Sequence, residues 1–237
     1  MSHAETRRRR GEHAKFPPRP LRLRVRPISR SLRHANSGQH LEASARPAIL
    51  DLLRDRTRAA HDRAEEALPL LDPALDAARY RAILASFWGF HAALEPRLAA
   101  VAELRELALD PAERRKLPRL EHDLRTLGAD PARLPLADAV PEVEGAAAAL
   151  GCMYVLEGAT LGGRVITRHL AARGIGPGSG GAFFAGYGDE TGEMWKSFSA
   201  SIGAYAEAHP ESIPRIVDAA DETFTLLERW LARPQNV

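Results

Sequence analysis

Residues 150–170 of the chain read LGCMYVLEGATLGGRVITRHL. The apolar residues have the spacing of a buried helix, although a glycine inside a helix costs up to about 1 kcal/mol relative to alanine. Gly151, Gly158 and Gly162 are separated by seven and four residues and therefore share one face of that helix. A face without side chains lets another helix, or a flat ligand, come close to the backbone. The stretch predicts a core helix with one bare face.

The regions on both sides of this stretch are also predicted to be helical. Apolar residues at helical spacing indicate helices over about 47–69, 77–107, 110–128, 142–173, 190–208 and 212–232. Pro96 should kink the second helix or break it in two, and Asp110 followed by a proline should open the third. The glycine-rich stretch 174–188 predicts a loop that could fold over a pocket edge. With no strand alternation, the sequence predicts an all-α domain, a compact helical bundle, over residues 47–237.

Charge divides the chain into two parts. Residues 1–46 hold twelve Lys and Arg against three acids, a charge of +9, whereas the remainder holds 21 bases and 28 acids, a charge of −7. Without lasting apolar periodicity, residues 1–46 are predicted to be a disordered, Arg-rich extension. A solvated extension is the favoured reading, and a transit peptide or contact with nucleic acid or membrane are the alternatives. The acidic body is a poor candidate for nucleic-acid binding.

The length of the apolar runs and the number of cysteines indicate where in the cell the protein is expected. No apolar run reaches the roughly 18 residues typical of a membrane span, so we expect none. The single cysteine, Cys152, excludes an internal disulfide framework and fits a reducing compartment, which we take to be the cytoplasm. Cys152 could be a thiolate ligand, but the favoured interpretation is a small buried hydrophobe.

A second pattern runs along the first predicted helix. Arg54, Arg58, His61 and Glu65 follow one another at steps of four, three and four residues. Glu65 could accept a hydrogen bond from one ring nitrogen of His61, which would make the other nitrogen a better metal ligand. A solvated face with i,i+4 ion pairs is the competing interpretation. Together with the bare glycine face, however, the pattern favours a flat, iron-containing anion between two helices, and haem fits that description.

The other four histidines of the body have simpler interpretations. His91 is predicted to be a packed aromatic residue, and His122 and His209 to be satisfied or solvent-facing. His169 lies seven residues after Gly162, on roughly the same face, and is a minor alternative for lining the same cavity.

Three stretches resemble a known family. LRDRTRAAHDRAE at 53–65 resembles the proximal helix of haem oxygenases, and LEGATLGGR at 156–164 resembles their distal helix. With FFAGYGDETGEMW at 183–195, the chain looks most like the bacterial biliverdin-forming enzymes associated with bacteriophytochromes. The likeness runs from about residue 47 to residue 231 and implies a haem-oxygenase-like helical bundle.

This resemblance implies roles for particular residues. His61 would be the proximal iron ligand and Glu65 its hydrogen-bonding partner. Gly158 and Gly162 would be the distal glycines over the iron, with Gly163 beside them.

Four more positions match haem-binding positions of the family. Arg54 and Arg58 match basic residues that face the propionates, and Lys196 matches a basic propionate contact in the penultimate helix. Phe224 matches an aromatic residue that packs near the haem.

The chain departs from the family pattern after the first distal glycine. Many haem oxygenases have an aspartate there that anchors water, whereas this chain has Ala159, followed by the hydroxyl of Thr160. A propionate-contacting tyrosine of some members also has no clean match, because Met153 falls there, with Tyr154 adjacent.

The resemblance implies oxygen-dependent degradation of haem to biliverdin, carbon monoxide and ferrous iron. Haem would be both cofactor and substrate, an external reductase or ferredoxin would supply electrons, and a biliverdin-accepting phytochrome is a candidate partner. A haem carrier of the same fold that lost turnover through Ala159 is the alternative. A di-iron oxidase is disfavoured, because no body histidine belongs to a Glu-x-x-His pair.

Overall fold

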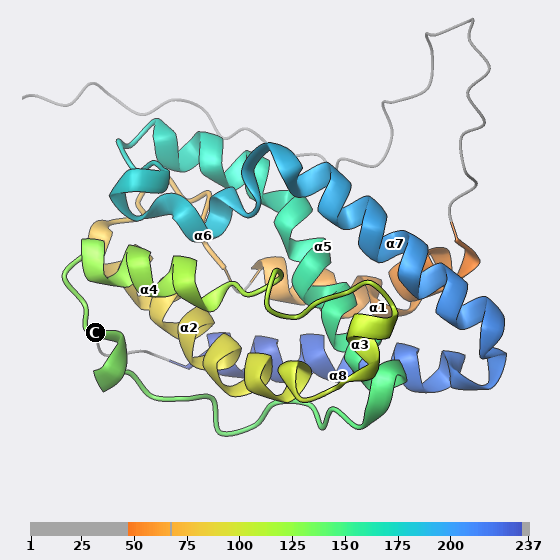
Figure 1. Ribbon diagram of the computed structural model, residues 1–237. Coiled ribbons are helices and arrows are strands. Elements are labelled where there is room, and N and C mark those ends of the chain that lie inside the picture. The colour runs from red at the N-terminus through yellow and green to blue at the C-terminus, as the bar shows by residue number, and fades with distance from the viewer. Residues whose placement is uncertain (1–46, 67, 234–237) are drawn as a thin grey trace, which may run out of the picture. The chain divides into compact units, whose positions relative to one another are not determined.

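The computed structural model describes residues 47–66 and 68–233, which are mostly helical with no strand among them (Figure 1). The long helices are α1 (Ala48–Glu66), α2 (Ala77–Ala99), α4 (Leu117–Thr126), α5 (Gly145–Ala171), α7 (Thr191–Ala208) and α8 (Ile213–Leu231). Shorter pieces are α3 (Glu103–Glu106), α6 (Ala182–Ala185), three 3₁₀ turns (Pro131–Arg133, Gly188–Glu190 and Pro210–Ser212) and a π turn (Pro177–Gly181). The predicted all-α bundle is confirmed. The prediction of disorder for residues 1–46 lies outside the described residues.

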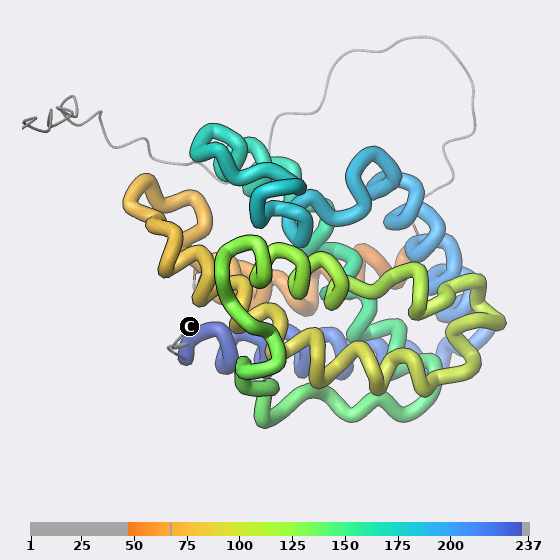
Figure 2. The backbone as a smooth tube through the Cα atoms, turned by 60° about the vertical axis from the view of Figure 1, so that its left-hand side comes forward, coloured from red at the N-terminus to blue at the C-terminus, as the bar shows by residue number. Residues whose placement is uncertain are grey.

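The helices pack around α5 and α8. α8 packs along both α5 and α1, and α7 contacts the same two helices. Within the described part of the chain, α1 and α5 barely touch each other. α2 and α4 lie side by side on another side of the bundle (Figures 1 and 2). Helical spacing in the sequence predicts an apolar stripe along the first helix. Its residues in α1 are buried, at Leu50, Leu53, Thr57, Ala60 and Ala64, whereas its last residue, Leu68, is half-buried beyond the end of the helix. α7 and α8 therefore set the relative positions of α1 and α5.

The first half of α5 lies in the core, and its second half emerges from it. Leu150 and Cys152 are fully buried, whereas the side chains of Leu161 and Val165 are 44% and 49% exposed. The core half approaches α8 through Gly151. A Cβ atom at that position would lie 2.3 Å from the carbonyl oxygen of Ile216, far inside van der Waals contact. Gly151 therefore serves helix packing, which was one of the two predicted uses of the glycine face.

The stretch 174–188, predicted to be a loop, contains the π turn and α6. Two helix boundaries also differ from those expected by more than one turn. The third helix begins at Leu117 and not at Asp110, so the predicted start is wrong by one and a half to two turns. Asp110 caps a local turn, because its Oδ1 accepts a hydrogen bond from the amide of Ala112 at 3.0 Å. The second predicted helix is broken in two: α2 ends at Ala99, with Pro96 in its last turn, and α3 follows. The corrected boundary at Leu117 matters for the site, because Arg114 and Lys116, just before it, are buried.

By length and composition alone, α5 is apolar enough to cross a membrane. More than half of that apolar stretch is buried by other parts of the domain, and the core helix of a globular protein has the same composition. The absence of a membrane-spanning segment therefore stays a prediction.

Replacing Gly151 and Gly162 separately by alanine should give opposite effects on stability. Gly151→Ala forces α8 to shift, with an expected loss of about 1–3 kcal/mol in the free energy of unfolding. Gly162→Ala meets no atom within 4 Å and removes an entropic cost, so a gain of up to about 1 kcal/mol is expected. Urea unfolding without haem measures both, and equal effects would contradict this packing.

Candidate functional site

His61 lies on the exposed side of α1, with 51% of its side chain accessible. Its ring meets the ring of Phe224 from α8 edge-on, with 5.7 Å between centroids. The nearest carboxylate oxygens belong to Glu65, 3.7 Å from Nε2, and Asp62, 3.9 Å from Nδ1. Both distances exceed that of a hydrogen bond, so the predicted bond between His61 and Glu65 is not made here. The structure does bring His61 of α1 into contact with Phe224 of α8, the aromatic residue that the family resemblance places near the haem.

The cations predicted to face propionates are exposed. Arg54 lies 3.2 Å and Arg58 3.6 Å from the Asp55 carboxylate on their own helix. Lys196 is 78% exposed on α7 and lies 3.9 Å from Glu193. Exposed pairs of this kind contribute about 0–1 kcal/mol each, so these cations can exchange such partners for an anionic ligand at low cost. Their role as propionate contacts stays a prediction.

The emerging half of α5 presents a bare, apolar face. Among the described residues, a Cβ atom at Gly158 would contact only Trp195 of α7, at 3.9 Å, and one at Gly162 would have no neighbour within 4 Å. Leu161 and Val165 are adjacent and partly exposed. A flat ligand could therefore reach the peptide backbone at Gly158 and Gly162 without displacing a side chain.

The neighbouring side of α5 is packed. A Cβ at Gly163 would lie 2.3 Å from the carbonyl oxygen of Phe184, which also accepts a hydrogen bond from the Thr167 hydroxyl at 3.1 Å. Gly163 is therefore explained by packing against the 182–187 segment, and its role beside a ligand stays a prediction. The Thr160 hydroxyl donates to the carbonyl of Glu157, one turn earlier, at 2.6 Å.

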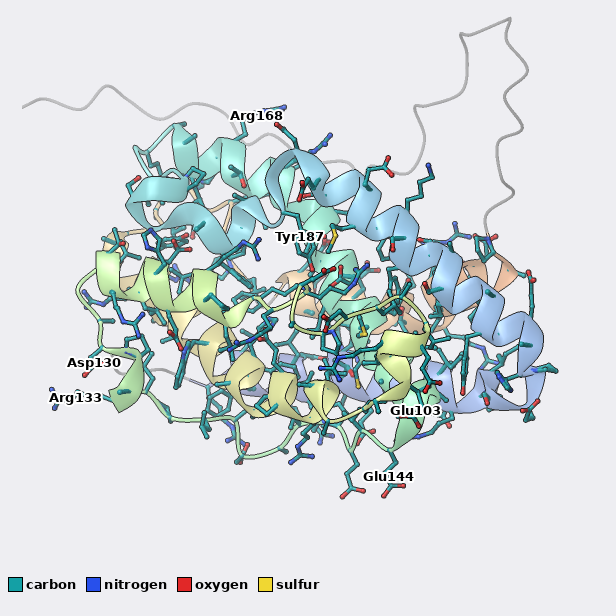
Figure 3. All side chains as sticks on the ribbon, viewed as in Figure 1. Glu103, Asp130, Arg133, Glu144, Arg168 and Tyr187 are labelled. Carbon is teal, nitrogen blue, oxygen red and sulfur yellow. The ribbon has the colours of Figure 1, made fainter. Side chains whose placement is uncertain are left out.

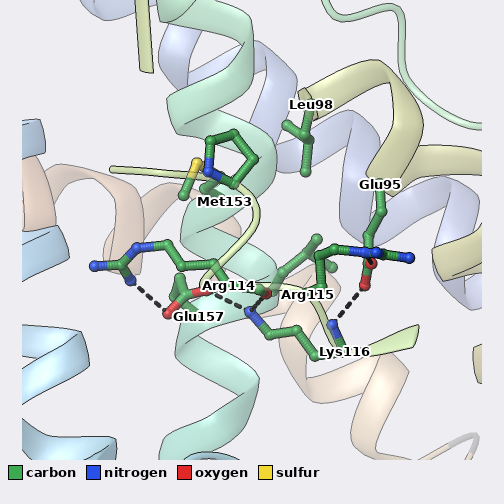
Figure 4. A pocket seen from close by; sticks show the side chains of 9 residues that line it. Glu95, Leu98, Arg114, Arg115, Lys116, Met153 and Glu157 are labelled. Atoms are coloured by element: carbon green, nitrogen blue, oxygen red, sulfur yellow. Dashed lines mark hydrogen bonds and ion pairs between the residues drawn. The ribbon is translucent and has the colours of Figure 1, made fainter. Parts of the chain in front are cut away.

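A buried ionic cluster, which sequence reasoning missed, lies next to Gly158 (Figure 4). Glu157 is 1% exposed, and its Oε2 accepts a hydrogen bond from Arg114 Nη1 at 2.9 Å. Its Oε1 accepts from the Tyr187 hydroxyl at 2.8 Å and from Lys116 Nζ. Tyr187 is half-buried, whereas charged side chains such as Glu144 and Arg168 project from the surface (Figure 3).

The cluster continues to α2 through a second buried carboxylate. Glu95 Oε1 accepts a hydrogen bond from the backbone amide of Lys116 at 2.8 Å and lies 3.0 Å from His91 Nδ1. His91 is buried and meets the Phe183 ring edge-on at 5.6 Å, as expected of a packed aromatic residue. A cavity of about 20 Å³ lies between Glu95, Lys116 and Glu157, which is room for one water molecule.

Burial shifts the ionisation of these groups. It lowers the pKa of Lys116, although the Glu157 carboxylate opposes the shift. Burial and the nearby Glu157 charge both raise the pKa of Tyr187, which therefore remains a hydrogen-bond donor. Burial alone would raise the pKa of Glu95, but the His91 hydrogen bond and the Lys116 amide and charge bring it below the ordinary 4.5.

Only one feature of the sequence indicates this cluster. Glu157 is the single charged residue between Glu144 and Arg164, within an otherwise apolar helix. An acid there requires buried partners. Those partners, Arg114 and Lys116, were concealed because they fell inside the wrongly placed start of the third helix.

The remaining residues singled out from the sequence lie outside these arrangements. Burial raises the pKa of the Cys152 thiol to about 11, so the thiol stays neutral, as expected of a small buried hydrophobe. His122 and His209 are exposed, as predicted. His169 pairs with Arg173, whose guanidinium also binds the carbonyls of residues 72 and 73.

Glu95→Gln should make stability less dependent on acid. The folded pKa of Glu95 lies below its unfolded value, so its stabilising charge is fully present above about pH 4.5 and is lost as the pH falls through the folded pKa. We expect the variant to be less stable by about 1–3 kcal/mol at pH 6, with the deficit shrinking below pH 4.5. Urea unfolding at pH 3–7 measures this, and a constant deficit would contradict the assignment.

Comparisons with known proteins agree with this architecture. The family model described as Heme oxygenase matches residues 48–233. A curated protein named heme oxygenase, from Xanthomonas campestris pv. campestris (strain 8004), is 41% identical over 90 residues, which are 38% of this chain and about half (51%) of that relative.

Two solved structures share the fold. The NO- and CO-bound heme oxygenase from Neisseria meningitidis aligns with a TM-score of 0.68 and 23% identity, over 77% of this chain and 89% of that one. Heme oxygenase-1 from Synechocystis sp. PCC6803 in complex with heme aligns with a TM-score of 0.57 and 19% identity, over 77% and 90%. Since the family model covers more than half of the sequence, the chain belongs to the haem oxygenase family.

Proposed function

We propose that this protein degrades haem in an oxygen-dependent reaction that yields biliverdin, carbon monoxide and ferrous iron. The observation that carries the proposal is the open face of α5 at Gly158 and Gly162, which the described side chains leave clear. It is combined with membership of the haem oxygenase family. His61 is exposed on α1, and both helices are held by α7 and α8. An external reductase or ferredoxin would supply the electrons.

The residues of α1, α7 and α8 fit a haem. The His61 ring nitrogens make no hydrogen bond to the adjacent carboxylates, so one of them would bind the iron, and the edge contact with Phe224 would orient the ring. Glu65, whose Oε1 lies 3.7 Å from Nε2, would accept a hydrogen bond from the nitrogen that does not bind the iron. Arg54, Arg58 and Lys196 are exposed cations that would pair with the two propionates.

The residues of α5 would act on the opposite face. Bare backbone at Gly158 and Gly162 leaves room for dioxygen close to the ring, while Leu161 and Val165 supply apolar surface that excludes water. Bound haem supplies the redox chemistry and is itself the substrate. The chain contributes orientation, access and exclusion of competing reactions.

A haem carrier with little turnover is the second candidate. It is favoured by Ala159, which has no acidic group to anchor water, and by the Thr160 hydroxyl, which is already bonded to the carbonyl of Glu157. In the absence of an acid at position 159, proton delivery would depend on water.

We extend the proposal to the subtype and the compartment. The likeness of residues 183–195 to bacteriophytochrome-associated enzymes supports a biliverdin-accepting phytochrome as partner, and the single buried Cys152 supports a cytoplasmic location.

Hemin titration followed by turnover separates the two candidate functions. With hemin bound, an electron donor and air should cause loss of the Soret band and growth of a biliverdin absorbance, with the product identified by chromatography. A Soret band that persists under these conditions would contradict the enzyme and support the carrier. Absence of any Soret shift on titration would contradict both.

His61→Ala should remove the nitrogen-ligated haem spectrum. Because loss of a hydrogen-bonding partner alone weakens metal binding about 10–100-fold, loss of the ligand itself should raise the Kd for hemin by more than about tenfold. His122→Ala, at another exposed histidine, is the matched control and should leave the spectrum unchanged. An unaltered spectrum in His61→Ala would remove His61 from the site.

A further inference from the structure

The buried cluster around Glu157 has no part in the contacts proposed for haem, yet it lies where α5 leaves the core. Val155 and Leu156, just before it, are 3% and 6% exposed, whereas Ala159 and Leu161, just after it, are exposed. Glu157 is therefore one of the last buried residues before the open segment 158–162.

Contacts with other segments hold this open segment at both ends. At the start, both carboxylate oxygens of Glu157 are bonded to Arg114, Lys116 and Tyr187. At the end, the backbone at Gly163 rests on the Phe184 carbonyl. At about 100° per residue, Glu157 and Gly163 flank the helix, each roughly 120° from the line through the open glycines. Both contacts therefore leave the open face free.

The two contacts belong to one connected unit. The segment 182–187 carries both the Phe184 carbonyl and the Tyr187 hydroxyl. Asp123, at the C-terminal part of α4, fixes this segment by accepting hydrogen bonds from the amides of Ala182 at 2.9 Å and Phe183 at 2.7 Å. Arg114 extends the unit to α7 through a 3.3 Å hydrogen bond to the carbonyl of Met194, next to Trp195, which faces Gly158. The height and rotation of α5 are thereby tied to α4 and α7.

Stability is a weak explanation for such a cluster. The desolvation of buried ions offsets much of their attraction, and well-packed apolar residues often stabilise a protein equally well. In some proteins buried charges are retained because they specify one register. Here each oxygen of Glu157 has its own donors, and a rotation of α5 would separate them.

We propose that Glu157 is a positioning residue, which sets the height and rotation of the Gly158–Gly162 backbone against a ligand without touching that ligand. The part of this inference that concerns haem rests on the proposed function. The part that concerns the order of α5 does not.

The test replaces Glu157 together with its three bonded side chains, so that no charge among these four is left unpaired, and keeps Glu95, which stays bonded to His91 and to the amides of Lys116 and Leu117. The variant combines Arg114→Met, Lys116→Met, Glu157→Leu and Tyr187→Phe and should melt within a few degrees of the wild-type protein. Hydrogen exchange followed by mass spectrometry on the full chain without haem is the first readout. Amides at 158–166 should exchange at least tenfold faster than in the wild type, with those at 146–156 unchanged. Wild-type exchange at 158–166 would overturn the proposal.

The second readout is the C–O stretching band of the reduced hemin complex with carbon monoxide. This band should shift or broaden in the four-site variant, because the backbone over the ligand is no longer held in one position. Leu104→Ala, which destabilises the core at α3, is the control and should keep the wild-type band. If the four-site variant melts like the wild type and keeps the wild-type C–O band, the cluster does not position the backbone over the ligand. That result would overturn the proposal.

A second substitution covers failure of the four-site variant to fold. Glu157→Asp keeps the charge and retracts the carboxylate by one methylene, so the same faster exchange and altered band are expected, and their absence would overturn the proposal. The exchange readout needs no haem. If the wild-type protein fails to bind hemin, the proposed function is therefore contradicted, while the ordering role of Glu157 is still decided.

Discussion

The structure depends on the close contact between the backbones of α5 and α8 at Gly151. Only glycine permits this approach, because a Cβ atom would lie 2.3 Å from the carbonyl oxygen of Ile216. α8 also packs along α1 and carries Phe224 against His61. Together with α7, α8 therefore positions the glycine-bearing and the histidine-bearing helix, which hardly touch each other within the described residues.

The two sides of the candidate site differ in rigidity. On α1, His61 and its basic neighbours are exposed and weakly paired, so they can rearrange around a ligand at little cost. On α5, the glycine backbone is flanked by the buried bonds of Glu157 and by the Phe184 carbonyl. Such an arrangement suits a reaction in which the reacting face must be held in place while the binding side accommodates entry and release.

The fold was largely predictable from the sequence, but the different structural roles of the glycines of α5 were not. Helical periodicity indicated the all-α bundle and the buried stripe of α1, because each depends only on local spacing. Gly151 and Gly162 look alike in sequence, and their difference arises because α8 packs against one and not the other. The contact of His61 with Phe224, 163 positions later, is likewise tertiary, although family resemblance had indicated both residues.

The buried cluster shows a second limit, because periodicity treats every charged residue as surface. Arg114 and Lys116 were therefore hidden in a stretch that reads as a helix start, and only the isolated acid Glu157 could have signalled partners.

The central claim is that one haem lies between the His61 side of α1 and the bare backbone of α5. A crystal structure of the hemin complex tests this most directly. The account predicts iron bonded to a ring nitrogen of His61, with the opposite face of the porphyrin in contact with the backbone at Gly158 and Gly162. Iron bonded to another residue, or a porphyrin that does not contact α5, would contradict it.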